Sequence, residues 1–160
     1  MFRLAIPIAV CILLADQLSK WWILNLVMVP PEDIVVTSFF TVVLAWNPGI
    51  SFSQLGHVDP WILSGLALAI VAGLFVWLRR IERPWPAIAI AFIIGGALGN
   101  VIDRMWFGAV VDFLSFHWRD WYWPAFNLAD SAITVGVALL LIDSLFGKAE
   151  KAKNAPLQGG

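Results

Sequence analysis

The sequence predicts an all-α integral membrane protein with four transmembrane helices and a small sheet outside the membrane. Hydrophobic residues make up 61% of the 160 residues, and the mean hydropathy is +0.84. Both values lie far outside the usual range of soluble domains. The net charge of −1 offers no basic surface for nucleic acid, so nucleic acid is excluded as a partner.

Four apolar stretches are each long enough to cross a bilayer as a helix, which takes about 20 residues. They cover about residues 4–23, 60–78, 85–103 and 126–146. The first stretch is not typical of a cleaved signal peptide, because Asp16 and Lys20 interrupt its far end and no A-x-A-like site follows it. We expect it to stay in the protein, with the single cysteine, Cys11, packed inside it.

Basic residues at the helix boundaries predict the orientation. Positive residues favour the cytoplasmic side of a membrane protein, and here they gather at three boundaries that a four-helix chain places on one side. We therefore expect both termini in the cytoplasm, a membrane domain over about residues 1–147 and a disordered cytoplasmic tail over 148–160. These basic residues are Arg3, Arg79, Arg80, Arg83, Lys148, Lys151 and Lys153.

The two outer loops, at about residues 24–59 and 104–125, differ in composition. The first contains Ile34 to Thr37 and Phe39 to Leu44, which are β-branched and aromatic runs of strand length after the Pro30-Pro31 break, so it predicts a small sheet. The second is crowded with aromatic residues and is typical of a loop or helix resting among lipid headgroups. These rings either anchor the loop alone or also border a site for a lipid-bearing substrate.

Polar residues gather toward the outer side of the membrane. Ionisable groups near hydrocarbon are costly, so their convergence at one depth indicates a reaction or binding site. The residues concerned are Asp16, Lys20, Asn47, Asn100, Arg104, Asp112, Asn127 and Asp130.

Asp112 and Asp130 are the candidate catalytic residues. Asp112 lies in an apolar strip and Asp130 about one turn inside the fourth helix, so both are expected at the outer surface. Two neighbouring carboxyls cannot both ionise cheaply, so one can act as a general acid while the other activates water, without a metal or other cofactor. The alternatives are that Asp130 belongs to a helix start capped by Asn127 and that Asp112 is an ordinary loop carboxylate.

The other polar residues have supporting roles in this interpretation. Asn100 and Arg104 share a helix face and could hold the backbone of an extended peptide; alternatively Arg104 only reaches the interface beside Asp103. Asp16 precedes Lys20 by four residues, which permits a buried ion pair. Gly95 and Gly99 have the spacing of a close helix contact.

Other classes of function fit the sequence less well. With two histidines, His57 and His117, and no H-E-x-x-H, a zinc protease is disfavoured, and Ser64 lacks the G-x-S-x-G context. A small proton-coupled transporter would place polar residues through the full membrane, whereas Asp143 is the one exception in the cytoplasmic halves. A scaffold without catalysis would need only the glycine contacts and Trp anchors.

Five ordered blocks resemble the type II signal peptidases, the lipoprotein signal peptidases of bacteria, over about residues 10–145. The blocks are Asp16-x-x-Ser19-Lys20; Asn47-x-Gly49-Ile50-Ser51-Phe52-Ser53; Gly95-Gly96-Ala97-x-Gly99-Asn100-x-x-Asp103-Arg104; Val111-Asp112-Phe113; and Phe126-Asn127-x-Ala129-Asp130-Ser131.

The resemblance implies a four-helix protease of the bacterial inner membrane, with a sheet cradle and active site at the periplasmic face. It implies cleavage of a prolipoprotein just before a cysteine that bears diacylglycerol, inhibition by the cyclic peptide globomycin, and contact with membrane lipid. We also expect a monomer. Asp112 and Asp130 would be the catalytic dyad. The residues that would line or support the substrate groove are Asp16, Lys20, Asn47, Gly96, Asn100, Arg104, Asn127 and Ala129.

Overall fold

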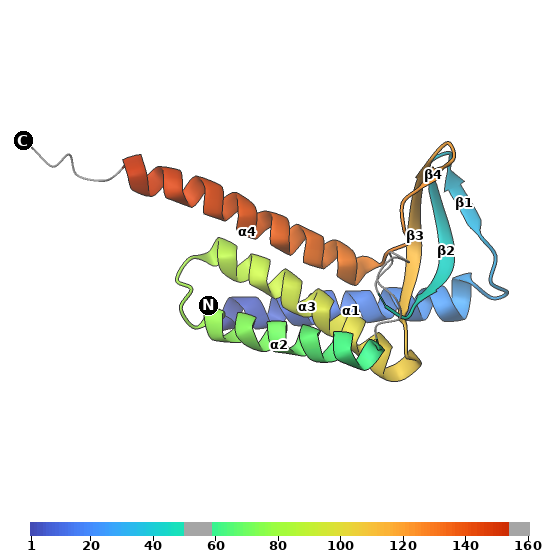
Figure 1. Ribbon diagram of the computed structural model, residues 1–160, viewed down its shortest axis with the longest axis horizontal. Coiled ribbons are helices and arrows are strands. Elements are labelled where there is room, and N and C mark those ends of the chain that lie inside the picture. Colours follow the sequence, from blue (N-terminus) through green and yellow to red (C-terminus); the bar gives the residue numbers. More distant parts are fainter. Residues whose placement is uncertain (50–58, 154–160) are drawn as a thin grey trace, which may run out of the picture.

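The computed structural model describes residues 1–49 and 59–153. Its helices and strands run along the chain in the order α1 (Phe2–Trp22), a π-helical turn (Ile23–Val27), β1 (Ile34–Thr37), β2 (Phe40–Asn47), α2 (Pro60–Leu78), α3 (Pro84–Phe107), β3 (Val110–Trp118), β4 (Trp121–Tyr122) and α4 (Leu128–Lys153). The sheet closes one end of the helix bundle (Figure 1). The N-terminus and the last turn of α4 lie toward the opposite end.

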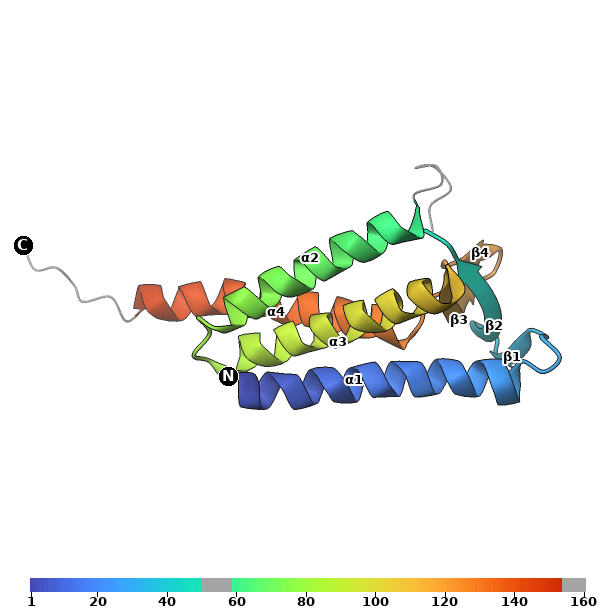
Figure 2. The same cartoon turned by 90° about the horizontal axis from the view of Figure 1, so that it is seen from below.

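Within the described residues, four helices are long and apolar enough to cross a membrane, as predicted. They are Phe2–Val27, Pro60–Leu78, Pro84–Phe107 and Leu128–Phe146. The third is the centre of the bundle, because 72% of its apolar 18-residue stretch is buried, against 11–17% for the corresponding stretches of the others. Figure 2 shows α3 between α1 and α2, with α4 behind it. The outward faces of the other helices are apolar, as expected for helices surrounded by lipid.

Glycines allow the neighbouring helices to approach α3 closely. A Cβ at Gly95 would lie 2.6 Å from the carbonyl oxygen of Ala9 on α1, and one at Gly96 would collide with the carbonyl oxygen of Ala129 on α4. A Cβ at Gly99 would collide with the carboxylate of Asp16. The predicted close helix contact is therefore confirmed, and Gly96 sits at a helix interface.

The sheet is larger than predicted. Its strands are antiparallel in the order β1-β2-β3-β4, and β2 pairs with β3 so that Ala45 lies opposite Asp112. The two strands predicted in the first loop are confirmed. The interfacial loop or helix predicted for the second loop is wrong for the residues of β3 and β4, and the description of the fold as all-α is not confirmed. The β-branched and aromatic side chains of β3 favour pairing with β2, which also satisfies their backbone groups.

The helix boundaries differ from those predicted. Helix α3 continues to Phe107 and ends at Gly108, whose φ of 74° is the left-handed conformation that glycine adopts readily. Helix α4 continues to Lys153 rather than ending near 146, because Ala, Glu and Lys are good helix formers. The expected disordered tail covers residues 148–160. Helix α4 includes residues 148–153 of it. Residues 154–160 lie outside the described residues, as do His57 and the part of the Asn47 block beyond Gly49.

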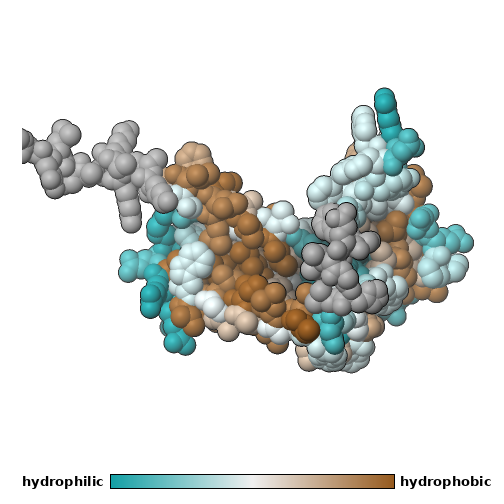
Figure 3. Space-filling view, viewed as in Figure 1, coloured by the Kyte–Doolittle hydropathy of each residue, from teal (hydrophilic) through white to brown (hydrophobic). Residues whose placement is uncertain are grey.

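The surface reflects this arrangement. In Figure 3 hydrophobic residues cover the helices, and hydrophilic residues gather toward both ends of the molecule. At the end away from the sheet, Arg83 at the start of α3 forms an ion pair of 2.8 Å with Asp143 of α4. The surface is hollowed between α4 and the sheet, which is where the candidate site lies.

Candidate active site

Asp112 is buried on β3, with only 2% of its surface exposed. Its Oδ1 accepts a 2.7 Å hydrogen bond from the side-chain amide of Asn127, and its Oδ2 accepts one of 3.1 Å from Asn47 on β2. The pKa of this carboxyl is raised to about 6, chiefly because burial disfavours its charge. The nearby charge of Asp130 adds to the rise in pKa, whereas the bonds from Asn47 and Asn127 oppose it.

Asp130 lies in the first turn of α4 and takes part in capping that helix. The backbone N–H of Asp130 donates to Oδ1 of Asn127 over 2.9 Å, and the N–H of Asn127 donates to Oδ2 of Asp130 over 3.3 Å. This is the reciprocal geometry of a capping box. The other oxygen of Asp130 accepts a 2.7 Å bond from the side-chain amide of Asn100. The helix-start interpretation of Asp130 is therefore confirmed, and it coexists with a place in the site.

Asn127 connects the two candidate catalytic carboxyls. Its side chain is fully buried, and its Nδ2 donates both to Asp112 and, over 3.1 Å, to the Oδ1 of Asn100. Its backbone N–H meets Asp130. The structure thus brings Asp112 from β3 and Asp130 from α4 to opposite sides of one asparagine, although 18 residues separate them in the sequence.

A cleft of about 630 Å³ opens beside these residues, between the first turns of α4 and the sheet. Arg104 reaches it from α3; its Nη1 donates weakly to the carbonyl oxygen of Asn100 at 3.4 Å. Among the described residues, the buried Nε of Arg104 has no hydrogen-bond partner. Residues lining the cleft include Asn47, Gly49, Arg104, Phe126, Asp130 and Ser131.

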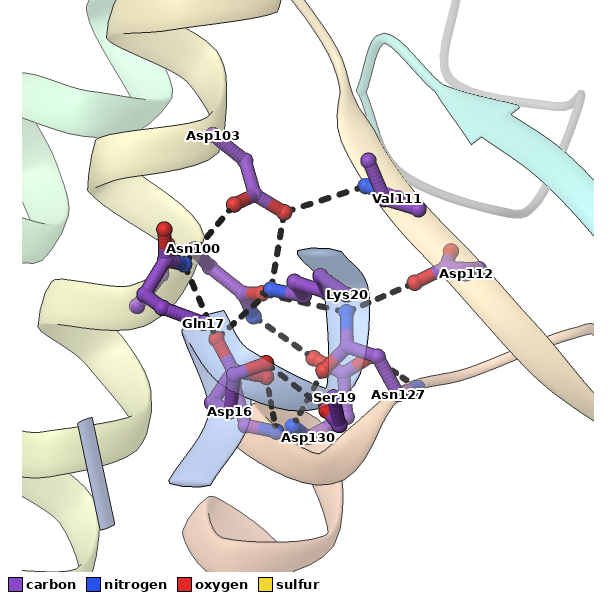
Figure 4. Close-up of polar contacts among 12 residues, drawn as sticks. Asp16, Gln17, Ser19, Lys20, Asn100, Asp103, Val111, Asp112, Asn127 and Asp130 are labelled. Atoms are coloured by element: carbon purple, nitrogen blue, oxygen red, sulfur yellow. Dashed lines mark hydrogen bonds and ion pairs between the residues drawn. The ribbon is translucent and has the colours of Figure 1, made fainter. Parts of the chain in front are cut away.

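A buried charge cluster lies beside Asn100 (Figure 4). The predicted ion pair is confirmed, because Nζ of Lys20 lies 2.8 Å from Asp16. Lys20 also pairs with Asp103 at 2.7 Å and donates to Oδ1 of Asn100 at 3.3 Å. Asp103 was expected beside Arg104, but its ion pair is with Lys20. Ala129, predicted as a supporting residue, donates its backbone N–H to Asp16 at 2.9 Å.

Sequence reasoning gave no site role to two residues of this cluster. Asp103 accepts a 3.1 Å hydrogen bond from the backbone N–H of Val111, and Gln17 donates to Asp103 at 3.0 Å. Gln17 was detectable, because an amide next to Asp16 in an apolar helix needs a polar partner. The hydrogen bond from Val111 to Asp103 was not detectable in the sequence, because it depends on how β3 packs against α3.

Aromatic residues of the second loop surround the cleft and the sheet. Trp123 and Phe126 line the cleft, and Phe126 stacks on Phe116 of β3 with ring centroids 5.8 Å apart. Trp118 and Trp121 are largely exposed, as anchoring among lipid headgroups requires. The structure therefore accommodates both interpretations of this loop: some rings border the cleft and others face outward.

Comparison with known proteins gives consistent matches along the chain. A family model described as signal peptidase (SPase) II matches residues 8–146. The lipoprotein signal peptidase of Pseudomonas syringae pv. tomato is 42% identical over 147 residues, covering 88% of this chain and 85% of the relative. That of Pseudoalteromonas atlantica is 44% identical, with 88% of each protein covered.

Two solved structures described as bacterial membrane enzymes are also similar. One has a TM-score of 0.78 and 28% identity, covering 98% of this chain and 93% of that one. The other has a TM-score of 0.76 and 30% identity, covering 88% and 92%. The range of the family match, residues 8–146, contains every candidate site residue.

Proposed function

Since this chain belongs to the signal peptidase II family, we propose that Asp112 and Asp130 are the catalytic dyad with which it cleaves prolipoprotein signal peptides. The observation that carries this proposal is the position of Asn127, which bonds to both carboxyls next to a cleft that Asp130 and Asn47, the hydrogen-bond partner of Asp112, line. The family similarity does not favour a transporter or a scaffold.

The surroundings of the two carboxyls suggest different roles for them. Asp112 is buried and its pKa is raised to about 6, so it retains a proton more readily than an ordinary aspartate and suits a general acid. Asp130 lies in the first turn of α4, where the helix dipole stabilises negative charge. It therefore suits the general base.

The reaction then follows the two-carboxyl route of aspartic peptidases. Asp130 removes a proton from a water molecule as its oxygen attacks the scissile carbonyl carbon, and Asp112 donates its proton to the carbonyl oxygen. When the tetrahedral intermediate collapses, Asp130 gives its proton to the leaving nitrogen, the C–N bond breaks, and one hydroxyl of the intermediate returns a proton to Asp112. The products are one carboxylic acid and one amine, so this chemistry calls for no cofactor.

The substrate would be a diacylglyceryl-modified prolipoprotein, cut immediately before its lipidated cysteine. Its signal helix and acyl chains keep it in the membrane, and a cleft at the sheet end of the bundle lets water reach a bond at the membrane surface. Arg104, with an unpartnered donor among the described residues, and Asn47 would hold the peptide backbone. The aromatic residues at the cleft would contact the lipid-bearing end.

The site would face the periplasm, with both termini in the cytoplasm. Arg79, Arg80 and Arg83 lie at the end of the bundle away from the sheet, and the positive-inside rule assigns that end to the cytoplasm. A chain with this topology in the bacterial inner membrane would meet prolipoproteins after their signal peptides have inserted.

The direct test is incubation of the purified protein with a diacylated prolipoprotein. The proposal predicts release of the signal peptide that a chelator does not affect and that globomycin blocks. Mass spectrometry of the product should place the new N-terminus at the lipidated cysteine. Loss of activity with the chelator, recovered by a divalent metal, would contradict the aspartic mechanism.

A further inference from the structure

Two buried carboxylates bind the backbone directly before each proposed catalytic aspartate. Oδ1 of Asp16 accepts the N–H of Ala129, the residue before Asp130, at 2.9 Å. Oδ2 of Asp103 accepts the N–H of Val111, the residue before Asp112, at 3.1 Å. Asp16 is fully buried and Asp103 is 1% exposed, so neither carboxylate is solvated by bulk water.

Lys20 joins these two carboxylates. Its Nζ lies 2.8 Å from Asp16 and 2.7 Å from Asp103, and the side chain is 3% exposed. Without this ammonium, two negative charges would face each other in a medium of low dielectric, where their repulsion is strong. The repulsion would push apart the backbone segments that the carboxylates hold.

The same ammonium also fixes an amide at the dyad. Lys20 donates to Oδ1 of Asn100 at 3.3 Å, and an ammonium cannot accept a hydrogen bond. The amide of Asn100 therefore turns its NH₂ toward Asp130, to which it donates at 2.7 Å. Lys20 thus acts on the positions of both aspartates through its contacts with Asp16, Asp103 and Asn100.

We propose that Asp16, Lys20 and Asp103 form a charge clamp that fixes the separation of Asp112 and Asp130, with Lys20 as its central positioning residue. The proposal rests on the proposed function, because the separation matters only if these two aspartates react together. It assigns Asp103 a role in positioning the general acid through the N–H of Val111. A cluster that served only the stability of the fold would not make turnover depend on its charge balance.

The test compares Lys20→Met with the double variant Lys20→Met/Asp103→Asn in a cleavage assay on a diacylated prolipoprotein. Lys20→Met should lower kcat by about 100-fold, the cost of a displacement near 1 Å, and change KM little. Asp103→Asn removes the repulsion and retains an oxygen for Val111, so the double variant should be about tenfold faster than Lys20→Met. Wild-type kcat in Lys20→Met, or no recovery in the double variant, would overturn the clamp.

Arg83→Met is the matched control, since it removes a cation from an ion pair at the other end of α3 and should leave kcat unchanged. Thermal unfolding in detergent establishes that each variant is folded. If Lys20→Met does not fold, Asp103→Asn and Asp103→Leu replace it. The first retains an acceptor for Val111 and should be about 100-fold faster than the second; equal rates would overturn the clamp.

Asp112→Asn is assayed in parallel to separate the two proposals. Turnover by Asp112→Asn would refute the dyad and thus the proposed function. An inactive Asp112→Asn beside an unaffected Lys20→Met would refute the charge clamp alone.

Discussion

The side-chain amide of Asn127 donates a 2.7 Å hydrogen bond to Asp112, while the oxygen of the same amide accepts the backbone N–H of Asp130 and so caps the helix that carries it. One residue therefore fixes a strand-borne carboxyl relative to a helix-borne one. The positions of the two aspartates follow from helix capping and from strand pairing, which are ordinary features of folding.

Asn127→Ala should lose both the bond to Asp112 and the cap of α4. We expect a loss of about 1 kcal/mol in stability from the cap and a fall in kcat of about 100-fold from the misplaced carboxyls. Thermal unfolding in detergent and cleavage kinetics measure the two effects. Asn25→Ala is the control, because the side chain of the exposed Asn25 makes a local bond, to the carbonyl oxygen of Trp21. Equal kcat in the two variants would contradict the role of Asn127.

The activity should depend on pH through Asp112. Its pKa is raised to about 6, so the protonated acid prevails below that pH and is lost above it. We expect kcat/KM to fall as pH rises through the apparent pKa of the dyad. The Asn47 bond lowers the pKa of Asp112, so Asn47→Leu should move this fall to higher pH. A profile without an alkaline fall would contradict the assignment of Asp112 as the acid.

Gly99→Ala should disturb the charge clamp by steric conflict. The added Cβ would collide with the carboxylate of Asp16, and overpacking of this kind costs about 1–3 kcal/mol. We expect a lower unfolding temperature and slower cleavage. Gly73→Ala is the matched control, because a Cβ on that α2 glycine meets no atom within 4 Å among the described residues. If the two variants unfold at the same temperature, the proposed tight contact is wrong.

Much of the fold could be predicted because its signals are local. Hydrophobic length predicts the four spans, and the spacing of Gly95 and Gly99 predicts a close helix contact. The four-residue interval between Asp16 and Lys20 predicts their ion pair. Each of these depends on one helix and its regular geometry.

The parts that were missed depend on contacts between distant segments. The density of aromatic residues in the second outer loop suggested a loop or helix at the membrane interface. The aromatic residues of β3 instead lie in a strand that pairs with β2. The partnership of Asp103 with Lys20 requires α1 and α3 to be packed at one particular register. Asp103 stands beside Arg104 in the sequence, which suggested a local pair as one alternative, whereas its ion pair is with Lys20.

The most direct measurement is the turnover of a diacylated prolipoprotein by Asp112→Asn and Asp130→Asn. Each change is nearly isosteric and removes one acid or base, so each variant should remain folded and lose at least about 100-fold in kcat. The double variant should be little slower than either single variant, because the two residues act as a unit. Asp143→Asn, at the far end of α4, should cleave at the wild-type rate. Substantial turnover by either Asp112→Asn or Asp130→Asn would contradict the dyad.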